Sequence, residues 1–314
     1  MRLYTLLAAA KINLYLEIVG SRPDGFHELI MVMQSVSLCD RITVRSIGVD
    51  EIRVRCDHPL VPDDETNLAY KAAALVSDRC PGVMAKLGGV EITIEKQIPV
   101  GAGLAGGSSN AAAVLVGLDL LWNLGLTQSE LQELGAELGS DIPFCVSGGT
   151  AIATGRGERL DALPSIDNLH LVLAKYESEF VSTPWAYKTY RAEYGDTYLL
   201  DTQSWQQRQS QVRSGEMVRA VAQRNAQALS QHLCNDFEKI VLPAHPKTAA
   251  LKETMTSLGG LGTLMSGSGP SVFTLAESEA QANELAAKLR AAVPDPDLSL
   301  WTARFMPSGV QLAS

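Results

Sequence analysis

The chain has 314 residues, of which 46% are hydrophobic, enough to bury a large core that we expect two domains to share. A net charge of −9 and a pI near 5.1 argue against nucleic acid as the main partner. The five cysteines are scattered without a C-x-x-C pair, which is typical of reduced thiols in a cytoplasmic protein and not of a zinc site. The sequence has no apolar run of about 20 residues, so we expect no membrane span.

The first half of the chain alternates segments of strand-like, two-residue periodicity with segments of helical periodicity. We expect strands at 14–19, 41–46, 51–55 and 90–95, and helices at 67–79, 111–121 and 129–138. Thr127 and Glu130 have the spacing of a capping box, which predicts that the last of these helices begins there. Residues 148–157 are turn-rich and favour a domain boundary, which divides the chain into residues 1–157 and 158–314.

The second half has a similar mixture of strands and helices. Ser182 followed by Pro184 is a typical helix start. The segment 194–216 is polar and rich in glutamine, and we interpret it as a mobile or partly disordered excursion. The remaining expected elements are strands at 169–174 and 298–304, helices at 216–232, 245–258 and 278–293, and a glycine-rich turn at 264–273 that leads into a strand.

A glycine-rich run follows the strand at 90–95 and precedes the helix at 111–121. Its four glycines let the backbone approach a ligand closely and adopt positive φ. The Ser and Asn residues after them suit the turn into a helix, whose first N–H groups and partial positive charge form an anion site. The expected ligand is a polyphosphate. The run consists of Gly101, Gly103, Gly106 and Gly107, followed by Ser108, Ser109 and Asn110.

Three other interpretations of this run have less support. A P-loop needs a lysine before the closing Ser or Thr, and here Gly107 is followed by two serines. Residues 101–106 fit the dinucleotide fingerprint G-x-G-x-x-G. The acid expected about 20 residues later would be Asp119, which lies inside the predicted helix, so NAD-dependent oxidoreduction rests on this string alone. A turn that serves only close packing is the third alternative.

The segment Pro99–Ala111 resembles motif 2 of the GHMP kinases, the superfamily of galactokinase, homoserine kinase, mevalonate kinase and phosphomevalonate kinase. The resemblance implies an α+β, two-domain GHMP kinase fold. The N-terminal domain would be ribosomal protein S5 domain 2-like, the C-terminal domain would be ferredoxin-like, and the active site would lie in the cleft between them.

The same resemblance implies an ATP site. Asn67 and Lys96 would line the adenine pocket, and Ser108 and Ser109 would meet phosphate oxygens or Mg²⁺. No cluster of acidic residues indicates a metal site of the protein's own, so Mg²⁺ is expected mainly with ATP. The implied ATP-binding residues are Asn67, Lys96, Pro99, Val100, Gly101, Ala102, Gly103, Leu104, Ala105, Gly106, Gly107, Ser108, Ser109 and Asn110.

Lys11 and Asn13 share one face of an early strand, because side chains alternate with a period of two. Taken alone, this strand would face solvent, since a cation and an amide are costly to bury without partners. However, Ala10–Asn13 resembles motif 1 of the GHMP kinases, and Gly139–Phe144 resembles the segment that carries the family's catalytic base. The resemblance implies that Asp141 accepts the hydroxyl proton and that Lys11 keeps it ionised; their contact is a hypothesis.

The loop Gly20–Leu29 resembles that of the GHMP kinases that phosphorylate the 2-hydroxyl of a cytidine-diphosphate-linked methylerythritol, in the non-mevalonate route to isoprenoids. An aromatic residue followed by His can stack on a base and hydrogen-bond its edge, so Phe26 and His27 are the candidates for cytosine recognition. Residues 182–187 resemble a segment whose aromatic side chain contacts cytosine. This makes Tyr187 a candidate and Tyr176 its alternative, and Asn13 completes the substrate-binding set.

Two further segments resemble parts of the same family. Met265–Pro270 resembles motif 3, which closes against the phosphate loop, and we interpret Asn235–Glu238 as a structural element. The expected partner is a small cytidyl diphosphate, with no nucleic acid and no membrane, and the expected state is a monomer or weak homodimer. The remaining alternatives are a GHMP kinase of the homoserine or mevalonate type and a nucleotide-binding regulator without turnover.

Overall fold

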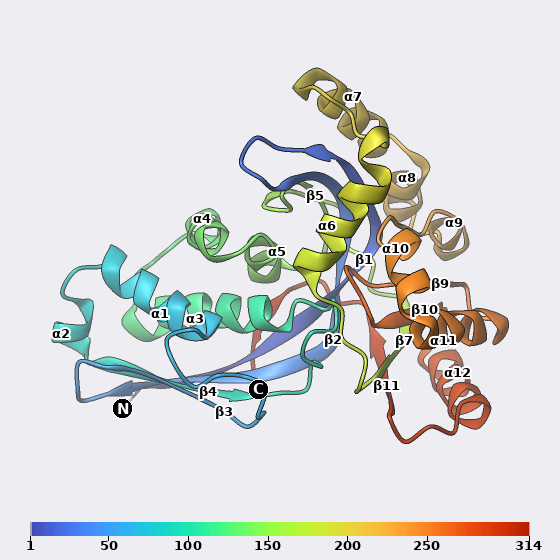
Figure 1. The fold of residues 1–314 in the computed structure, drawn as a ribbon. Helices are drawn as coiled ribbons and strands as arrows, with labels where there is room; N and C mark the ends of the chain where they lie inside the picture. Colours follow the sequence, from blue (N-terminus) through green and yellow to red (C-terminus); the bar gives the residue numbers. More distant parts are fainter. Residues whose placement is uncertain (1, 314) are drawn as a thin grey trace.

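The computed structural model describes residues 2–313, which form two β-sheets with helices packed on them (Figure 1). The first sheet has the strand order β12-β1-β2-β4-β3, and β5 pairs with β2, β6 with β5 and β8 with β1. The second sheet is antiparallel in the order β11-β7-β10-β9. The strands of the first sheet are β1 (Leu3–Ser21), β2 (His27–Ile47), β3 (Ile52–Cys56), β4 (Gly89–Glu95), β5 (Thr150–Gly155), β6 (Arg159–Ala162), β8 (Cys234–Asn235) and β12 (Val310–Leu312). Those of the second are β7 (His170–Tyr176), β9 (Gly262–Met265), β10 (Val272–Ala276) and β11 (Leu298–Arg304).

The two long strands β1 and β2 form the backbone of the first sheet. Their register shifts after Ala9, Asn13 and Ile18, and bulges of this kind bend a strand pair and increase its twist. The first part of the pair carries β12, β4 and β3, whereas the second part carries β5, β6 and β8. In Figure 1 the strands accordingly leave the flat part of the sheet and turn upward. Strand β1 therefore belongs to both parts of the bent sheet, with β12 beside its first part and β8 beside its second.

Helices cover one face of the first part of the sheet. The predicted helices are confirmed, and the capping box of Thr127 with Glu130 is present. Helix α3 begins at Gly106, ahead of the expected start, because the end of the glycine run already forms its first turn. Its Ala112 and Leu115 pack in the same buried core as Ile42 and Val44 of β2. The helices on this side are α1 (Leu68–Arg79), α2 (Val83–Leu87), α3 (Gly106–Trp122), α4 (Gln128–Leu138) and α5 (Ile142–Ser147).

The second sheet has a buried core on each face. On one face, Val172 and Ala174 of β7 lie in a core with helices α11 (Pro246–Ser257) and α12 (Glu279–Ala292). On the other face, Leu171 and Leu173 share a core with Ile12 of β1. Apolar side chains on alternate positions of a strand lie on one face, so Ala10, Ile12 and Leu14 hold the two sheets together.

The glutamine-rich segment is ordered, which makes the prediction of a mobile or partly disordered excursion at 194–216 wrong. It contains the 3₁₀ turn η1 (Gly195–Thr197) and helix α7 (Thr202–Arg213), whose N-cap Asp201 accepts a hydrogen bond from the Ser204 N–H at 2.9 Å. Its Val212 is buried in a small core with Val19 and Ile30. The composition gave a wrong prediction because a polar helix gains most of its stability from tertiary contacts, which composition does not reveal.

Helix α6 (Thr183–Tyr194) begins directly after Ser182, as predicted. The helix expected at 216–232 is interrupted, because Arg224 adopts a positive φ of 51° between its two parts. The remaining helices are α8 (Glu216–Ala222), α9 (Ala226–Gln231) and α10 (Glu238–Ala244).

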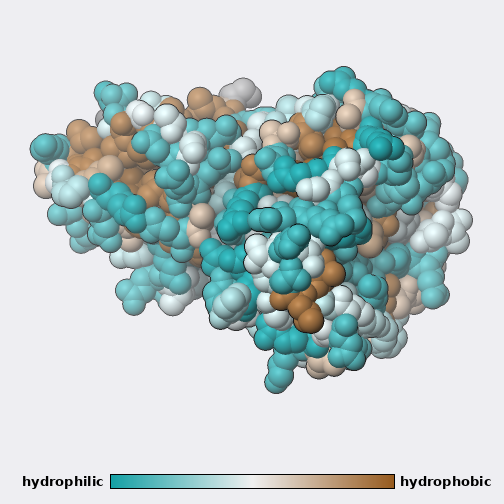
Figure 2. Space-filling view, turned by 90° about the horizontal axis from the view of Figure 1, so that it is seen from above, coloured by the Kyte–Doolittle hydropathy of each residue, from teal (hydrophilic) through white to brown (hydrophobic). Residues whose placement is uncertain are grey.

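Residues 148–157, expected to form turns, include strand β5. Because β5 pairs with β2 and β6 with β5, the first sheet continues to Ala162, and β12 returns to it near the end of the chain. A domain division at residue 157 stays a prediction. Seen from above, the surface is mainly hydrophilic, with scattered hydrophobic areas (Figure 2). Among residues 2–313, no helix is long and apolar enough to cross a membrane.

Candidate active site

The glycine-rich loop meets the second glycine-rich turn backbone to backbone. The Ser266 hydroxyl donates to the Gly103 carbonyl at 3.1 Å, and a Cβ on Gly103, where φ is +73°, would overlap the Ser266 carbonyl oxygen. Asn235 fixes the second turn, since its amide donates to the carbonyls of Met265 and Gly267, each at 2.7 Å. The segment Met265–Pro270 therefore packs against the glycine-rich loop, as predicted.

One buried carboxylate, Asp40 on β2, holds the segment that connects β4 to this loop. It is fully buried and accepts hydrogen bonds from the backbone N–H groups of Gln97 and Ile98 at 2.7 and 2.8 Å. It also accepts one from the Asn110 amide at 2.7 Å and pairs with the Lys96 ammonium. Asp40 was not among the predicted site residues; in the sequence it directly precedes the strand expected at 41–46.

The serines after the glycines differ in what they can reach. Ser109 is 1% exposed, and its hydroxyl donates to the Ala9 carbonyl at 2.7 Å, so it joins α3 to β1 and is not free for a phosphate. Ser108 is partly exposed in the first turn of α3. Asn67 caps α1 by accepting from the Ala69 N–H at 2.8 Å. ATP contacts of Ser108 and Asn67 stay predictions, and the geometry disfavours one through the Ser109 hydroxyl.

Nucleotide contacts of the loop stay predictions, but the structure brings its predicted members together. Gly106 lies against Lys96, and Gly107 lies near Leu68 beside the start of α1. A pocket of about 240 Å³ lies between the loop and the start of α6. Gly101, Phe180 and Ser268 are among its lining residues.

Lys11 and Asn13 face inward, so the interpretation of a solvent-facing strand is wrong. Lys11 is 5% exposed and Asn13 is fully buried. The Lys11 ammonium donates to the Asn13 side-chain oxygen at 2.8 Å and lies 3.6 Å from an Asp141 carboxylate oxygen. Asp141 occupies the N-cap position of α5 without capping it, and its side chain is 32% exposed. This carboxylate is therefore paired with a cation yet open to a ligand.

Two of the predicted cytosine-binding residues, His27 and Tyr187, are in direct contact. The His27 and Tyr187 rings stack with centroids 4.7 Å apart, and Phe26 is 51% exposed beneath the Arg156 guanidinium at 4.8 Å. Burial and, after it, the Asp141 carboxylate raise the pKa of Tyr187. The geometry favours Tyr187 over the alternative Tyr176, which lies on β7 under the Lys247 ammonium.

His27 is held in its neutral form. Burial, and after it the Arg191 guanidinium, lower the pKa of His27 to about 4. Its Nε2 atom is buried and has no hydrogen-bond partner among residues 2–313. A neutral imidazole offers one donor and one acceptor. The Nε2 atom is therefore a hydrogen-bonding group that the described part of the protein leaves unused.

Two family models match the chain, "GHMP kinases N terminal domain" over residues 67–149 and "GHMP kinases C terminal" over residues 217–295. The chain is similar to a 4-diphosphocytidyl-2-C-methyl-D-erythritol kinase of Nostoc punctiforme, with 58% identity covering 100% of this chain and 99% of the relative. A crystal structure of 4-(cytidine 5'-diphospho)-2C-methyl-D-erythritol kinase has 32% identity and a TM-score of 0.73, covering 96% of this chain and 98% of the other. A homoserine kinase from Cytophaga hutchinsonii shares the fold, with 17% identity and a TM-score of 0.77, covering 100% and 98%.

The chain therefore belongs to the GHMP kinase family. Within that family, it groups with the 4-diphosphocytidyl-2-C-methyl-D-erythritol kinases. The dinucleotide interpretation of the glycine run is wrong, because the run connects β4 of a mainly antiparallel sheet to α3 and not two strands of a doubly wound parallel sheet.

We predict that Asp40→Asn destabilises the protein by about 3 kcal/mol and raises the KM for ATP. The substitution leaves the Lys96 ammonium without its buried counter-charge, and breaking a buried pair on one side costs about 3–5 kcal/mol. Urea unfolding and initial rates at varied ATP measure the two effects. The matched control is Asp50→Asn at an exposed position, and a free energy of unfolding equal to that of this control would contradict the prediction.

Proposed function

We propose that this chain transfers the γ-phosphoryl group of ATP to the 2-hydroxyl of 4-diphosphocytidyl-2-C-methyl-D-erythritol, in the non-mevalonate route to isoprenoid precursors. The observation that carries the proposal is the Lys11–Asp141 pair, 3.6 Å apart. The Lys11 backbone N–H donates to the Leu104 carbonyl of the glycine-rich loop. Burial and, after it, the Asp141 carboxylate raise the pKa of Tyr187, whose ring stacks on His27. The identity of 58% to a relative with that name supports the same substrate.

Asp141 is the base in this proposal. Its partly exposed carboxylate accepts the proton of the acceptor hydroxyl as the oxygen attacks phosphorus. The Lys11 ammonium stabilises the negative charge that develops on the attacking oxygen. Asn13 holds Lys11 from the second side, so the ammonium keeps its place as charge moves. The rest of the rate enhancement comes from positioning of the two substrates.

ATP would bind at the glycine-rich loop, with its phosphates at the N-terminus of α3. Within the described part of the chain, no group of three His, Cys, Asp or Glu side chains could hold a metal ion alone. The residues present fit a Mg²⁺ ion that arrives with the phosphates, with the Ser108 hydroxyl as a candidate oxygen ligand. Such an ion would neutralise charge on the transferred group.

The cytidyl group would bind at Phe26, His27 and Tyr187. The neutral His27 ring can pair with the hydrogen-bonding edge of cytosine, and the exposed Phe26 ring offers a stacking face. We further propose that the enzyme acts in the cytoplasm as a monomer or weak homodimer. The acidic net charge and the mainly hydrophilic surface in Figure 2 support this part of the proposal.

The direct test measures ADP release with ATP and Mg²⁺ in the presence of 4-diphosphocytidyl-2-C-methyl-D-erythritol, mevalonate or homoserine. We expect turnover with the cytidyl substrate only. Turnover with mevalonate or homoserine instead would leave a GHMP kinase but contradict the assignment of Phe26 and His27. Nucleotide binding without any turnover would favour the regulator.

We predict that the KM for the cytidyl substrate does not change between about pH 5.5 and 8. With a pKa lowered to about 4, His27 stays neutral throughout this range, whereas an ordinary histidine would gain a proton below about pH 6.5. Initial rates at saturating ATP and Mg²⁺ measure this KM, and the diphosphate diester of the substrate does not titrate there. A KM that changes with a midpoint near pH 6.5 would contradict the prediction.

A further inference from the structure

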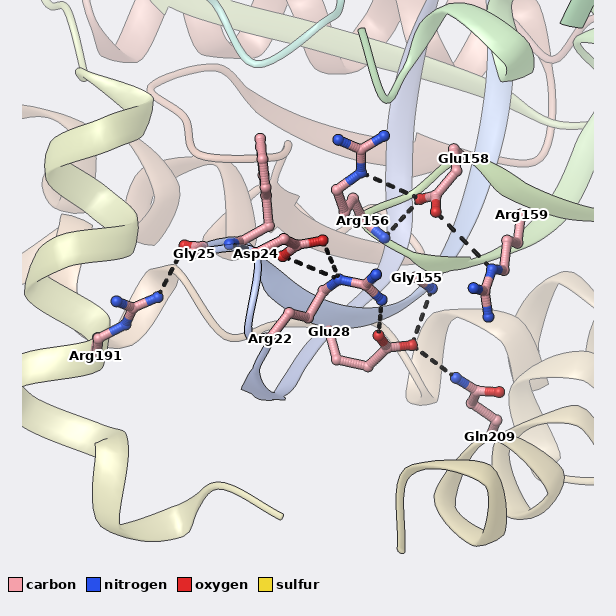
Figure 3. A network of polar contacts seen from close by, with 11 residues as sticks. Arg22, Asp24, Gly25, Glu28, Gly155, Arg156, Glu158, Arg159, Arg191 and Gln209 are labelled. Carbon is pink, nitrogen blue, oxygen red and sulfur yellow. Dashed lines mark hydrogen bonds and ion pairs between the residues drawn. The ribbon is translucent and has the colours of Figure 1, made fainter. Parts of the chain in front are cut away.

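Helix α7 reaches the loop that carries Phe26 and His27 through one buried carboxylate. Glu28, which directly follows His27, is 2% exposed. It accepts hydrogen bonds from the Arg22 guanidinium at 2.6 Å, the Gly155 N–H at 3.1 Å and the Gln209 amide of α7 at 2.9 Å (Figure 3). A buried carboxylate is stable only when such donors surround it. Glu28 therefore ties three separate segments to one point.

Each of these segments contributes to the surroundings of Phe26. Arg22 also contacts Asp24, whose carboxylate accepts from the Phe26 N–H at 3.1 Å, so the loop is fixed from within. Gly155 directly precedes Arg156, the residue whose guanidinium lies over the Phe26 ring. The position of Glu28 consequently determines both where Phe26 lies and what covers it.

A second set of contacts holds α7 in place on β1. The Arg208 guanidinium contacts the Glu17 carboxylate at 2.9 Å and the Tyr15 hydroxyl at 3.2 Å. Trp205 lies against Gly20, where a Cβ would come within 2.6 Å of the indole nitrogen. The helix is thereby anchored at two points on the strand that also carries Lys11.

We propose that Gln209 is a positioning residue for cytidyl recognition, and that α7 stabilises the Phe26–His27 loop through Glu28. The inference rests on the proposed function of this loop. Gln209 does not touch the substrate in this account. It supplies one of the three donors that keep Glu28 fixed, so its loss loosens the loop and the Gly155–Arg156 turn together. This stabilisation affects binding of the cytidyl group and not the phosphoryl transfer.

The test compares Gln209→Ala with Gln207→Ala, a control on the same helix at an exposed glutamine for which the described residues offer no side-chain partner. We expect Gln209→Ala to raise the KM for the cytidyl substrate about tenfold, consistent with a lost hydrogen bond to a charged group. The kcat and the KM for ATP should stay within about twofold, and Gln207→Ala should match the wild type. Gln209→Glu, which places a second carboxylate against Glu28, should raise the KM further.

Binding of CDP, measured by calorimetry, gives a readout that does not need turnover. We expect it to weaken about tenfold in Gln209→Ala, with the thermal midpoint measured alongside. A variant that is less thermostable but binds CDP like the control would overturn the inference, as would equal losses in both KM values. A wild-type protein that binds CDP but does not phosphorylate the cytidyl substrate would contradict the proposed function and leave this comparison intact.

Discussion

Strand β1 buries both of its faces, and the arrangement of the candidate active site depends on this. One face supplies Ala10, Ile12 and Leu14 to the core that joins the two sheets. The opposite face buries Lys11 and Asn13, and a buried ammonium is costly unless charge and hydrogen bonds compensate it. The Asn13 oxygen and the Asp141 carboxylate provide that compensation. The same contacts that make Lys11 tolerable in the core therefore place it beside the candidate base.

Two buried carboxylates, Asp40 and Glu28, hold together the segments around the predicted ATP and cytidyl sites. Asp40 binds Lys96 and Gln97, which lie between β4 and the glycine-rich loop, and Asn110 of α3. Glu28 accepts hydrogen bonds from Arg22 in the loop between β1 and β2, from Gly155 at the end of β5 and from Gln209 of α7. In each case a fixed negative charge gathers donors from segments distant in sequence. A buried carboxylate surrounded by hydrogen-bond donors therefore lies next to the segments of the predicted nucleotide site and of the predicted cytidyl site.

Local patterns allowed much of this to be predicted from the sequence. The capping box at Thr127, the helix start at Ser182 and the shared face of Lys11 and Asn13 need only neighbouring residues. Asp40 and Lys96 are 56 residues apart, and Gln209 and Glu28 are 181 apart, so no local pattern could pair them. Helix α7 was missed for the same reason, since contacts with β1 and β2 hold it and not its own composition.

The most direct test of the account is a double-mutant cycle on Lys11 and Asp141. The measured quantity is kcat for the cytidyl substrate in Lys11→Met, Asp141→Asn and the double variant, with ADP binding as the check on folding. If the two side chains act as one unit, each single substitution should lower kcat by about 10²–10⁴, and the double variant should be little slower than the slower single. Losses that multiply in the double variant would contradict the account, because the two groups would then act independently.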